Sequence, residues 1–286
     1  MNATRGTLEI EALAAEVGPA RVAVAAHQPE SGREILLNAN EPFPPASTLK
    51  VAVMAEVFHQ AEQGLLGLGD RIPVVNSFTS AADGLPYSLR SEDDADSLLY
   101  DTIGRAKSLR ELLRRMIVKS SNLATNLLIG RISLSRINAL LHETGIEGTA
   151  VLRGIFDSRA QQAGISNSTT ARGLTRLMSL LAEGRLVSRP ASDAMIQIML
   201  GQEFNEGIPA GLPGTVRVAH KTGWDDQIYH DSGIVFPVAG GAYALTVLTR
   251  GFRAQAQAHS FAATVSKLIY SSWGRPIDDK LSVAAE

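Results

Sequence analysis

The stretch Phe43-Pro44-Pro45-Ala46-Ser47-Thr48-Leu49-Lys50-Val51 marks the change from an extended, proline-rich segment to an apolar helix. Proline fixes φ and lacks an N–H, so the residues before Ser47 favour an irregular extended backbone. Apolar residues then fill most positions up to Gln63, and Gly64 follows as a common helix end. The pattern predicts a largely buried helix from Ser47 to Gln63.

Strand patterns lie near both ends of the chain, and helical patterns lie between them. Apolar alternation or continuous apolar runs predict strands over residues 21–27, 33–39, 215–221, 231–238 and 242–249. Serine is a favoured helix start, and it predicts helices beginning at Ser108, Ser133, Ser168 and Ser188. Further helices are expected near residues 8–13 and over 122–129 and 254–272.

This order predicts a sheet built from both chain ends, with a helical insertion between them. We expect residues 1–60 and 203–286 to form one discontinuous domain that contains the sheet. Residues 61–202 are expected to form the inserted all-α domain.

The bulk composition limits the classes of partner. The 286 residues are 45% hydrophobic and carry a net charge of −2, so no basic field attracts nucleic acid or anionic lipid. The chain has no cysteine, which excludes disulfides and thiolate nucleophiles. We expect a monomer that acts on a small molecule or peptide. Because no basic-then-apolar leader is seen, the expected location is the cytoplasm, or the periplasm or exterior if a signal has been removed.

Ser47 and Lys50 stand three residues apart at the start of the predicted helix, and therefore on one face. The helix N-terminus favours an alkoxide or oxyanion, and burial among apolar neighbours lowers the pKa of a lysine towards that of a general base. The spacing alone is weak, since roughly one Ser-x-x-Lys is expected by chance in such a chain. A capped helix with a solvent-directed lysine stays an alternative.

Two further motifs follow at long separations. Ser120-Ser121-Asn122 lies between two predicted helices, where a serine is often only a cap but can also relay a proton. Lys221-Thr222-Gly223 ends a predicted strand and is expected by chance in roughly one such chain in seven. Lys221 and Thr222 offer a cation and a hydroxyl to a carboxylate, and Gly223 permits a close approach to the strand. The N–H of Trp224 can face that of Ser47 as the second donor of an oxyanion hole.

Together the three motifs resemble those of the class A β-lactamase family, within the serine β-lactamase and penicillin-binding protein superfamily. Leu109-Arg110-Glu111-Leu112-Leu113, Ser168-Thr169-Thr170-Ala171-Arg172 and His220-Lys221-Thr222-Gly223 extend the similarity to most of residues 20–270. The resemblance implies an α/β (α+β) sandwich with an antiparallel sheet flanked by helices, plus an all-α domain, with the active site between the two. It implies Ser47, Lys50, Ser120 and Lys221 as catalytic residues and Asn122, Thr222, Gly223 and Trp224 as substrate-binding residues. The implied substrate is a β-lactam or a related amide or ester.

The sequence departs from the family where the acyl-enzyme is hydrolysed. Family members use a glutamate in a Glu-x-x-Leu-Asn stretch of the omega loop, whereas residues 153–159 contain only Asp157 as a carboxylate. We interpret Asp157 as an ion-pair partner of Arg153 or Arg159. The alternative that it replaces the glutamate as base, if the loop backbone lies closer to the site, stays open. Ser121 stands where the family usually has aspartate. The acidic loop over 81–101 lengthens the first inter-motif spacing, and we expect it to be solvated.

Several alternatives stay open. A penicillin-binding peptidase or esterase would acylate but barely deacylate, and a serine-dependent glutaminase shares similar short motifs. A silent β-lactam-binding protein would have no chemical reason to keep all four catalytic residues. No cofactor or metal is expected: His220 and His230 flank the third motif, but a third ligand is lacking, so hydrogen bonding within the sheet is preferred.

Overall fold

The computed structural model describes residues 3–273. One five-stranded antiparallel sheet has the strand order β2-β1-β9-β8-β7. Its strands are β1 (Arg21–Gln28), β2 (Arg33–Leu37), β7 (Arg217–Asp225), β8 (Ile228–Phe236) and β9 (Tyr243–Arg250). Strands from both ends of the chain therefore pair in one sheet, which confirms the predicted fold class.

The helices account for most of the remaining structure. They are α1 (Ala3–Ala15), α2 (Lys50–Glu62), α3 (Leu109–Val118), α4 (Asn122–Ile132), α5 (Leu134–Glu143), α6 (Ser158–Gln162), α7 (Ala171–Glu183), α8 (Arg189–Met199) and α9 (Gln255–Trp273). Short 3-10 turns are η1 (Ala46–Leu49), η2 (Ser91–Asp93), η3 (Ser97–Thr102) and η4 (Ile208–Gly211), and short strands are β3 (Arg71–Pro73), β4 (Phe78–Thr79), β5 (Pro86–Tyr87) and β6 (Ala106–Ser108). No helix among residues 3–273 is both long and apolar enough to cross a membrane.

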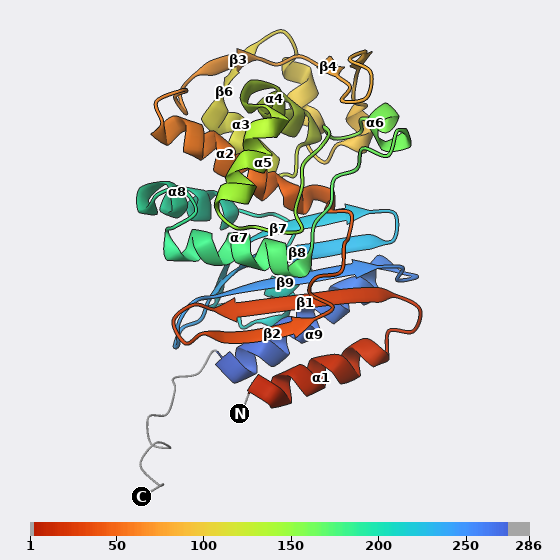
Figure 1. Cartoon of the computed structure of the whole chain (residues 1–286), viewed down its shortest axis with the longest axis vertical. Helices are drawn as coiled ribbons and strands as arrows, with labels where there is room; N and C mark the ends of the chain where they lie inside the picture. Colours follow the sequence, from red (N-terminus) through yellow and green to blue (C-terminus); the bar gives the residue numbers. More distant parts are fainter. Residues whose placement is uncertain (1–2, 274–286) are drawn as a thin grey trace, which may run out of the picture.

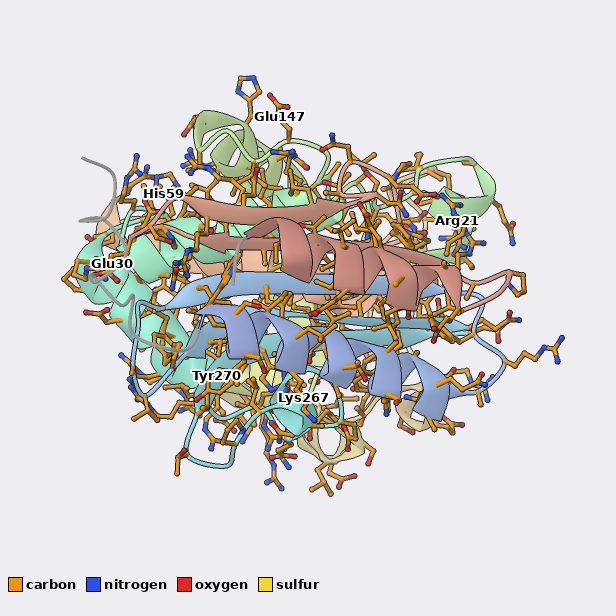
Figure 2. The ribbon with its side chains drawn as sticks, turned by 90° about the horizontal axis from the view of Figure 1, so that it is seen from below. Arg21, Glu30, His59, Glu147, Lys267 and Tyr270 are labelled. Atoms are coloured by element: carbon orange, nitrogen blue, oxygen red, sulfur yellow. The ribbon has the colours of Figure 1, made fainter. Side chains whose placement is uncertain are left out.

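The elements stack in layers around the sheet (Figure 1). Helices α1 and α9 pack together on one face, where Figure 2 shows them side by side. Helix α7 covers the other face, and α2 to α5 lie beyond it as a helical cap. One apolar core fills the space between the sheet and α1 and α9, with Trp273 and Tyr243 in edge contact. A larger core joins the helical cap to the sheet through Ala219, Ile234 and Ala244.

The expected division into domains stays a proposal. The contacts of α7 bear on the boundary between the two expected domains, because the prediction places this helix in the all-α domain. Thr175 on α7 donates its hydroxyl proton to the carbonyl of Ala25 at 3.0 Å and lies 2.9 Å from the hydroxyl of Thr246. We therefore propose that α7 is better grouped with the sheet than with residues 61–202.

Two predicted helix starts differ from the structure. The Ser47 helix begins as the turn η1, and its α-helical part starts only at Lys50. The helix expected to begin at Ser168 is α7, which begins at Ala171. Its cap is Thr170, whose hydroxyl accepts the N–H of Gly173 at 2.9 Å. Ser168 is unable to start the helix because its backbone is paired with Ala150 in a short antiparallel bridge. By contrast, the starts predicted at Ser108 and Ser188 are confirmed.

Candidate active site

Lys50 is the first residue of α2, and its side chain is 0% exposed. Its amine donates hydrogen bonds to the carbonyl of Ser120 at 2.6 Å, to the Ser120 hydroxyl at 3.2 Å and to Oδ1 of Asn122 at 2.8 Å. Ser47 lies one helical turn earlier, in η1, and is partly exposed. The amine thus connects the helix that follows Ser47 to the second motif.

Burial determines the protonation of Lys50. Removing the ammonium from water lowers the pKa of Lys50 from 10.5 to about 7, while the nearby Asp94 carboxylate partly opposes this shift. A lysine with this pKa is partly neutral at neutral pH. It can therefore accept a proton, which an ordinary lysine cannot do at this pH.

Ser120 lies between α3 and α4 with its backbone in the left-handed region, at φ 59°. Non-glycine residues seldom adopt this conformation, and it is often retained at functional sites. Here it brings the hydroxyl between two amines, 3.2 Å from Nζ of Lys50 and 3.1 Å from Nζ of Lys221. The Ser120 oxygen can therefore accept from either amine and pass its own proton to a third group.

Lys221 reaches the same hydroxyl from β7. Its side chain is 0% exposed, and its amine also donates to the carbonyl of Thr222 at 2.8 Å. Burial and the neighbouring Lys50 lower the pKa of Lys221 well below its ordinary value, although Asp231 opposes the shift. The hydroxyl of Thr222 is buried and has no hydrogen-bond partner among the described residues.

Gly223 is required where β7 passes η1. A Cβ at this position would lie 2.8 Å from the backbone nitrogen of Ser47 and 3.1 Å from that of Thr48. Real Cβ atoms essentially never come within 3.0 Å of such atoms, so only glycine permits this approach. The next residue, Trp224, packs its ring on Phe204 at 4.7 Å, and Nζ of Lys221 lies 5.9 Å from its centroid.

The three motifs therefore meet in space. Hydrogen bonds join Lys50, Ser120, Asn122 and Lys221, and backbone contact joins Ser47 to Gly223. The two histidines that flank the third motif form hydrogen bonds within the protein. His220 bonds to Asp231 at 2.8 Å, and His230 bonds to the carbonyl of Pro44 and the N–H of Thr249.

Asp94 is the buried site residue that the sequence reasoning missed. It belongs to the acidic loop, and its side chain is 8% exposed, so the expectation of a solvated loop is wrong here. Its carboxylate accepts the N–H groups of Asn122, at 2.9 and 3.0 Å, and of Leu123, at 2.8 Å. Asp96 is also buried, and it pairs with Arg115 at 2.8 Å. No local pattern distinguishes Asp94 from its exposed neighbour Asp93, because its partners lie 28 and 29 residues away.

Asp157 is held mainly by hydrogen bonds, and only one of the two arginines expected beside it contributes. Its carboxylate accepts the hydroxyl of Ser80 and the N–H of Ala81, each at 2.7 Å, and the N–H of Ala160 at 3.1 Å. Burial raises the pKa of this carboxyl, but the three hydrogen bonds outweigh it and hold the pKa below its usual value. Of the two arginines predicted as ion-pair partners, Arg159 pairs with Asp83 at 2.9 Å, whereas the charge of Arg153 acts on Asp157 and also lowers its pKa. Asp157 caps α6 and ties it to residues 80–81.

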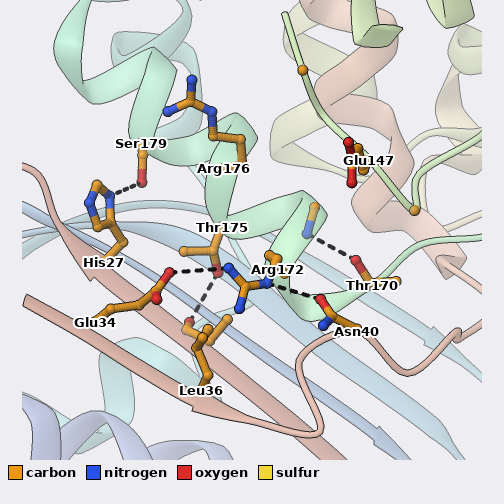
Figure 3. Close-up of a pocket in the computed structure, with 14 residues that line it drawn as sticks. His27, Glu34, Leu36, Asn40, Glu147, Thr170, Arg172, Thr175, Arg176 and Ser179 are labelled. Atoms are coloured by element: carbon orange, nitrogen blue, oxygen red, sulfur yellow. Dashed lines mark hydrogen bonds and ion pairs between the residues drawn. The ribbon is translucent and has the colours of Figure 1, made fainter.

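A separate cavity of about 450 Å³ lies between α7 and the strands β1 and β2 (Figure 3). Arg172 reaches across it to Glu34 at 3.5 Å and to Asn40 at 2.9 Å. Its lining contains none of the residues of the three motifs. The motif cluster and this cavity are therefore different places on the molecule.

The model of the β-lactamase enzyme family matches residues 7–273. The chain belongs to the β-lactamase enzyme family. Its resemblance to class A members is thereby confirmed at the level of the family.

Individual relatives and solved structures match most of the chain. Beta-lactamase L2 of Stenotrophomonas maltophilia is 29% identical over 240 residues, covering 82% of this chain and 74% of L2. The solved β-lactamase of Sphaerobacter thermophilus superposes with a TM-score of 0.80 at 23% identity, covering 95% of this chain and 98% of that one. PBP-A superposes with a TM-score of 0.79, also at 23% identity, covering 94% and 96%. At this identity, the two solved structures show a common fold.

Proposed function

We propose that this protein is a serine hydrolase of the class A β-lactamase type, which opens a β-lactam amide through an acyl-enzyme on Ser47. The observation that carries the proposal is the Ser120 hydroxyl, placed 3.2 and 3.1 Å from two fully buried lysine amines. This arrangement has the groups needed to move a proton from a nucleophile to a leaving nitrogen. The curated relative L2 is itself named a β-lactamase.

The acylation step balances with the groups present. Neutral Lys50 takes the proton of Ser47, whose oxygen forms a bond to the lactam carbonyl carbon. As the carbon–nitrogen bond breaks, Ser120 gives its proton to the departing nitrogen. Ser120 regains a proton from Lys50 along their 3.2 Å hydrogen bond, and this returns Lys50 to its neutral form.

The contact between η1 and β7 supports an oxyanion hole. Gly223 lies against the Ser47 nitrogen, and we propose that the N–H groups of Ser47 and Trp224 together bind the carbonyl oxygen. Loss of one such donor typically costs about 3–4 kcal/mol of transition-state stabilisation. The unpartnered hydroxyl of Thr222 and the amine of Lys221 supply groups for a substrate carboxylate, and Asn122 supplies an amide.

Deacylation is the step for which the site is least equipped. Asp157, the carboxylate of residues 153–159, is 1% exposed and already accepts three hydrogen bonds. We therefore propose that the acyl-enzyme is long-lived. The same observation favours a second candidate, a penicillin-binding acyltransferase that acylates and scarcely turns over. PBP-A, which shares the fold, has also been solved as a single-residue mutant in an acyl-enzyme complex with penicillin G.

The deciding experiment combines a chromogenic cephalosporin with intact-protein mass spectrometry. We expect a Ser47-dependent adduct and slow release of product, both lost in Ser47→Ala. Ser135→Ala, which removes an exposed hydroxyl on α5, is the matched control and should behave as the wild type. Stoichiometric adduct without turnover would favour the acyltransferase, and absence of both adduct and turnover would refute β-lactam chemistry.

A further inference from the structure

We propose that Asp94 is a positioning residue that holds the first turn of α4, and with it Ser120 and Asn122, against Lys50. This inference rests on the proposed function, because it assigns a role within the same site. It also assigns a role to the acidic loop over residues 81–101, which contains Asp94.

The N-terminal turn of α4 takes its hydrogen-bond acceptors from outside the helix. The first N–H groups of a helix have no partner within it and need one from elsewhere. Those of Asn122 and Leu123 donate to Asp94, while that of Ala124 donates to the hydroxyl of Ser121 at 3.3 Å. One carboxylate of the loop, far away in the sequence, thus accepts two of these three N–H groups.

The same helix turn also contacts the catalytic amine. The backbone N–H of Asn122 is held by Asp94, and its side-chain oxygen accepts from Lys50 at 2.8 Å. The negative charge of Asp94 also opposes the effect of burial on the Lys50 amine. A displacement of Asp94 would therefore move both the acceptor that Lys50 uses and the field that Lys50 experiences.

Asp94 is not available as a base for a hydrolytic water. Besides the two helix N–H groups, its oxygens accept the N–H of Asp96 at 3.0 Å and the hydroxyl of Tyr100 at 3.2 Å. A carboxylate offers about four lone-pair sites, and these contacts use them. Its influence on the chemistry must pass through Asn122 and Lys50.

The titratable groups around Asp94 and Lys50 lie on β7, η2 and η3. Lys221 faces Lys50 from β7, across the Ser120 hydroxyl, and Asp94 faces it from the loop. Around Asp94 itself are the hydroxyl of Tyr100 from η3 and the adjacent carboxylates of Glu92 and Asp93 in η2. With the Asp94 charge removed, Lys221 is the titratable group that still faces Lys50 across the Ser120 hydroxyl.

The test measures the rate of Ser47 acylation against pH in Asp94→Asn and in Asp96→Asn. The control variant alters a buried carboxylate of the same loop that pairs with Arg115 instead of α4. We expect Asp94→Asn to move the acidic limb of the profile to lower pH, because the neutral amine is then favoured. We also expect its plateau to fall by about tenfold or more as Asn122 is displaced. Asp96→Asn should lower the melting temperature and leave the limb in place.

A second readout does not depend on activity. The chain has only six lysines, so the ¹³Cε signal of Lys50 can be assigned with Lys50→Arg and titrated by NMR. The midpoint of the Lys50 titration should fall in Asp94→Asn. If Asp94→Asn fails to fold, Asp94→Ser, which keeps an oxygen acceptor, takes its place. An unmoved limb and an unmoved midpoint would overturn this inference. Absence of acylation in the wild type would overturn the proposed function, and the titration would still test Asp94.

Discussion

Two buried amines on one hydroxyl are the central feature at the scale of single residues. Lys50 and Lys221 are both 0% exposed, and both donate to the oxygen of Ser120. Two full charges this close, without water, would be strongly unfavourable, and loss of a proton removes the conflict. Burial therefore favours a neutral lysine amine, which is the form that the proposed function requires of its general base.

The pH dependence of acylation follows from this state of Lys50. Its pKa of about 7 means that the fraction of neutral amine rises through neutral pH. We expect the acylation rate to increase with pH, with a midpoint near 7, in a stopped-flow series against a chromogenic β-lactam. Lys50→Arg cannot lose its proton and should fall by about 10²–10⁴-fold at every pH. A wild-type rate that does not change with pH on either side of neutrality would contradict Lys50 as the base.

Asp157 should matter for stability and not for the acyl-enzyme. Asp157→Asn weakens a helix cap and the tie to Ser80, so we expect a loss of about 1–2 kcal/mol in the free energy of unfolding, measured with urea. Because the pKa of Asp157 is depressed in the folded protein, its contribution is present above its unfolded value of about 3.9 and is lost as pH falls through the folded value. The difference between variant and wild type should therefore shrink in acid. A longer adduct lifetime in Asp157→Asn would instead identify this carboxylate as the deacylating base.

At the scale of elements, the approach of β7 to η1 depends on one missing methyl group. Gly223→Ala would place a Cβ 2.8 Å from the Ser47 nitrogen, which forces the strand and the turn apart. We expect acylation to fall by about 10²-fold or more while the protein stays folded by circular dichroism. Gly130→Ala, in the interior of α4 with nothing within 4 Å of its Cβ, is the matched control. It should keep full activity and gain about 0.5–1 kcal/mol of stability.

The same scale shows what the sequence can and cannot predict. Local signals identified the elements well: the capping serines Ser108 and Ser188 start their helices as predicted, because a cap bonds within one turn. Ser168 failed because its backbone pairs with Ala150, far earlier in the chain, which no local pattern reveals. Asp94 was missed for the same reason. The motif residues meet as the resemblance implied, whereas the groups that hold them in place were not visible in the sequence.

The acidic loop and the second motif illustrate this dependence on distant contacts. Two departures from the family pattern, Ser121 and the lengthened loop, looked unrelated along the chain. In the structure both act on the start of α4, where Ser121 accepts one N–H and Asp94 accepts two. The loop thus supplies a carboxylate next to the position where the family usually has one.

At the scale of the whole molecule, the site lies where the helical cap meets the sheet, and the larger apolar core spans that junction. Leu112 and Leu128 of the cap belong to the same cluster as Leu177 of α7 and Ile234 of β8, all at 0% exposure. Because the cap and the sheet share this core, opening one exposes apolar surface of the other. We infer that the two parts unfold together, even if they are counted as separate domains.

Native-state hydrogen exchange with mass spectrometry tests this cooperativity. The slowest amides of α3 and α4 should have the same free energy of opening as those of β8 and β9, and both should fall with the same denaturant dependence. Ile234→Ala removes a fully buried side chain from the sheet side of the shared core and should cost about 2–5 kcal/mol. If the core is one unit, that loss appears equally in the exchange of α3, which lies in the cap. A loss confined to the strands would show that the helical part folds by itself, and that the Ser120 hydroxyl is positioned by docking of two independent units.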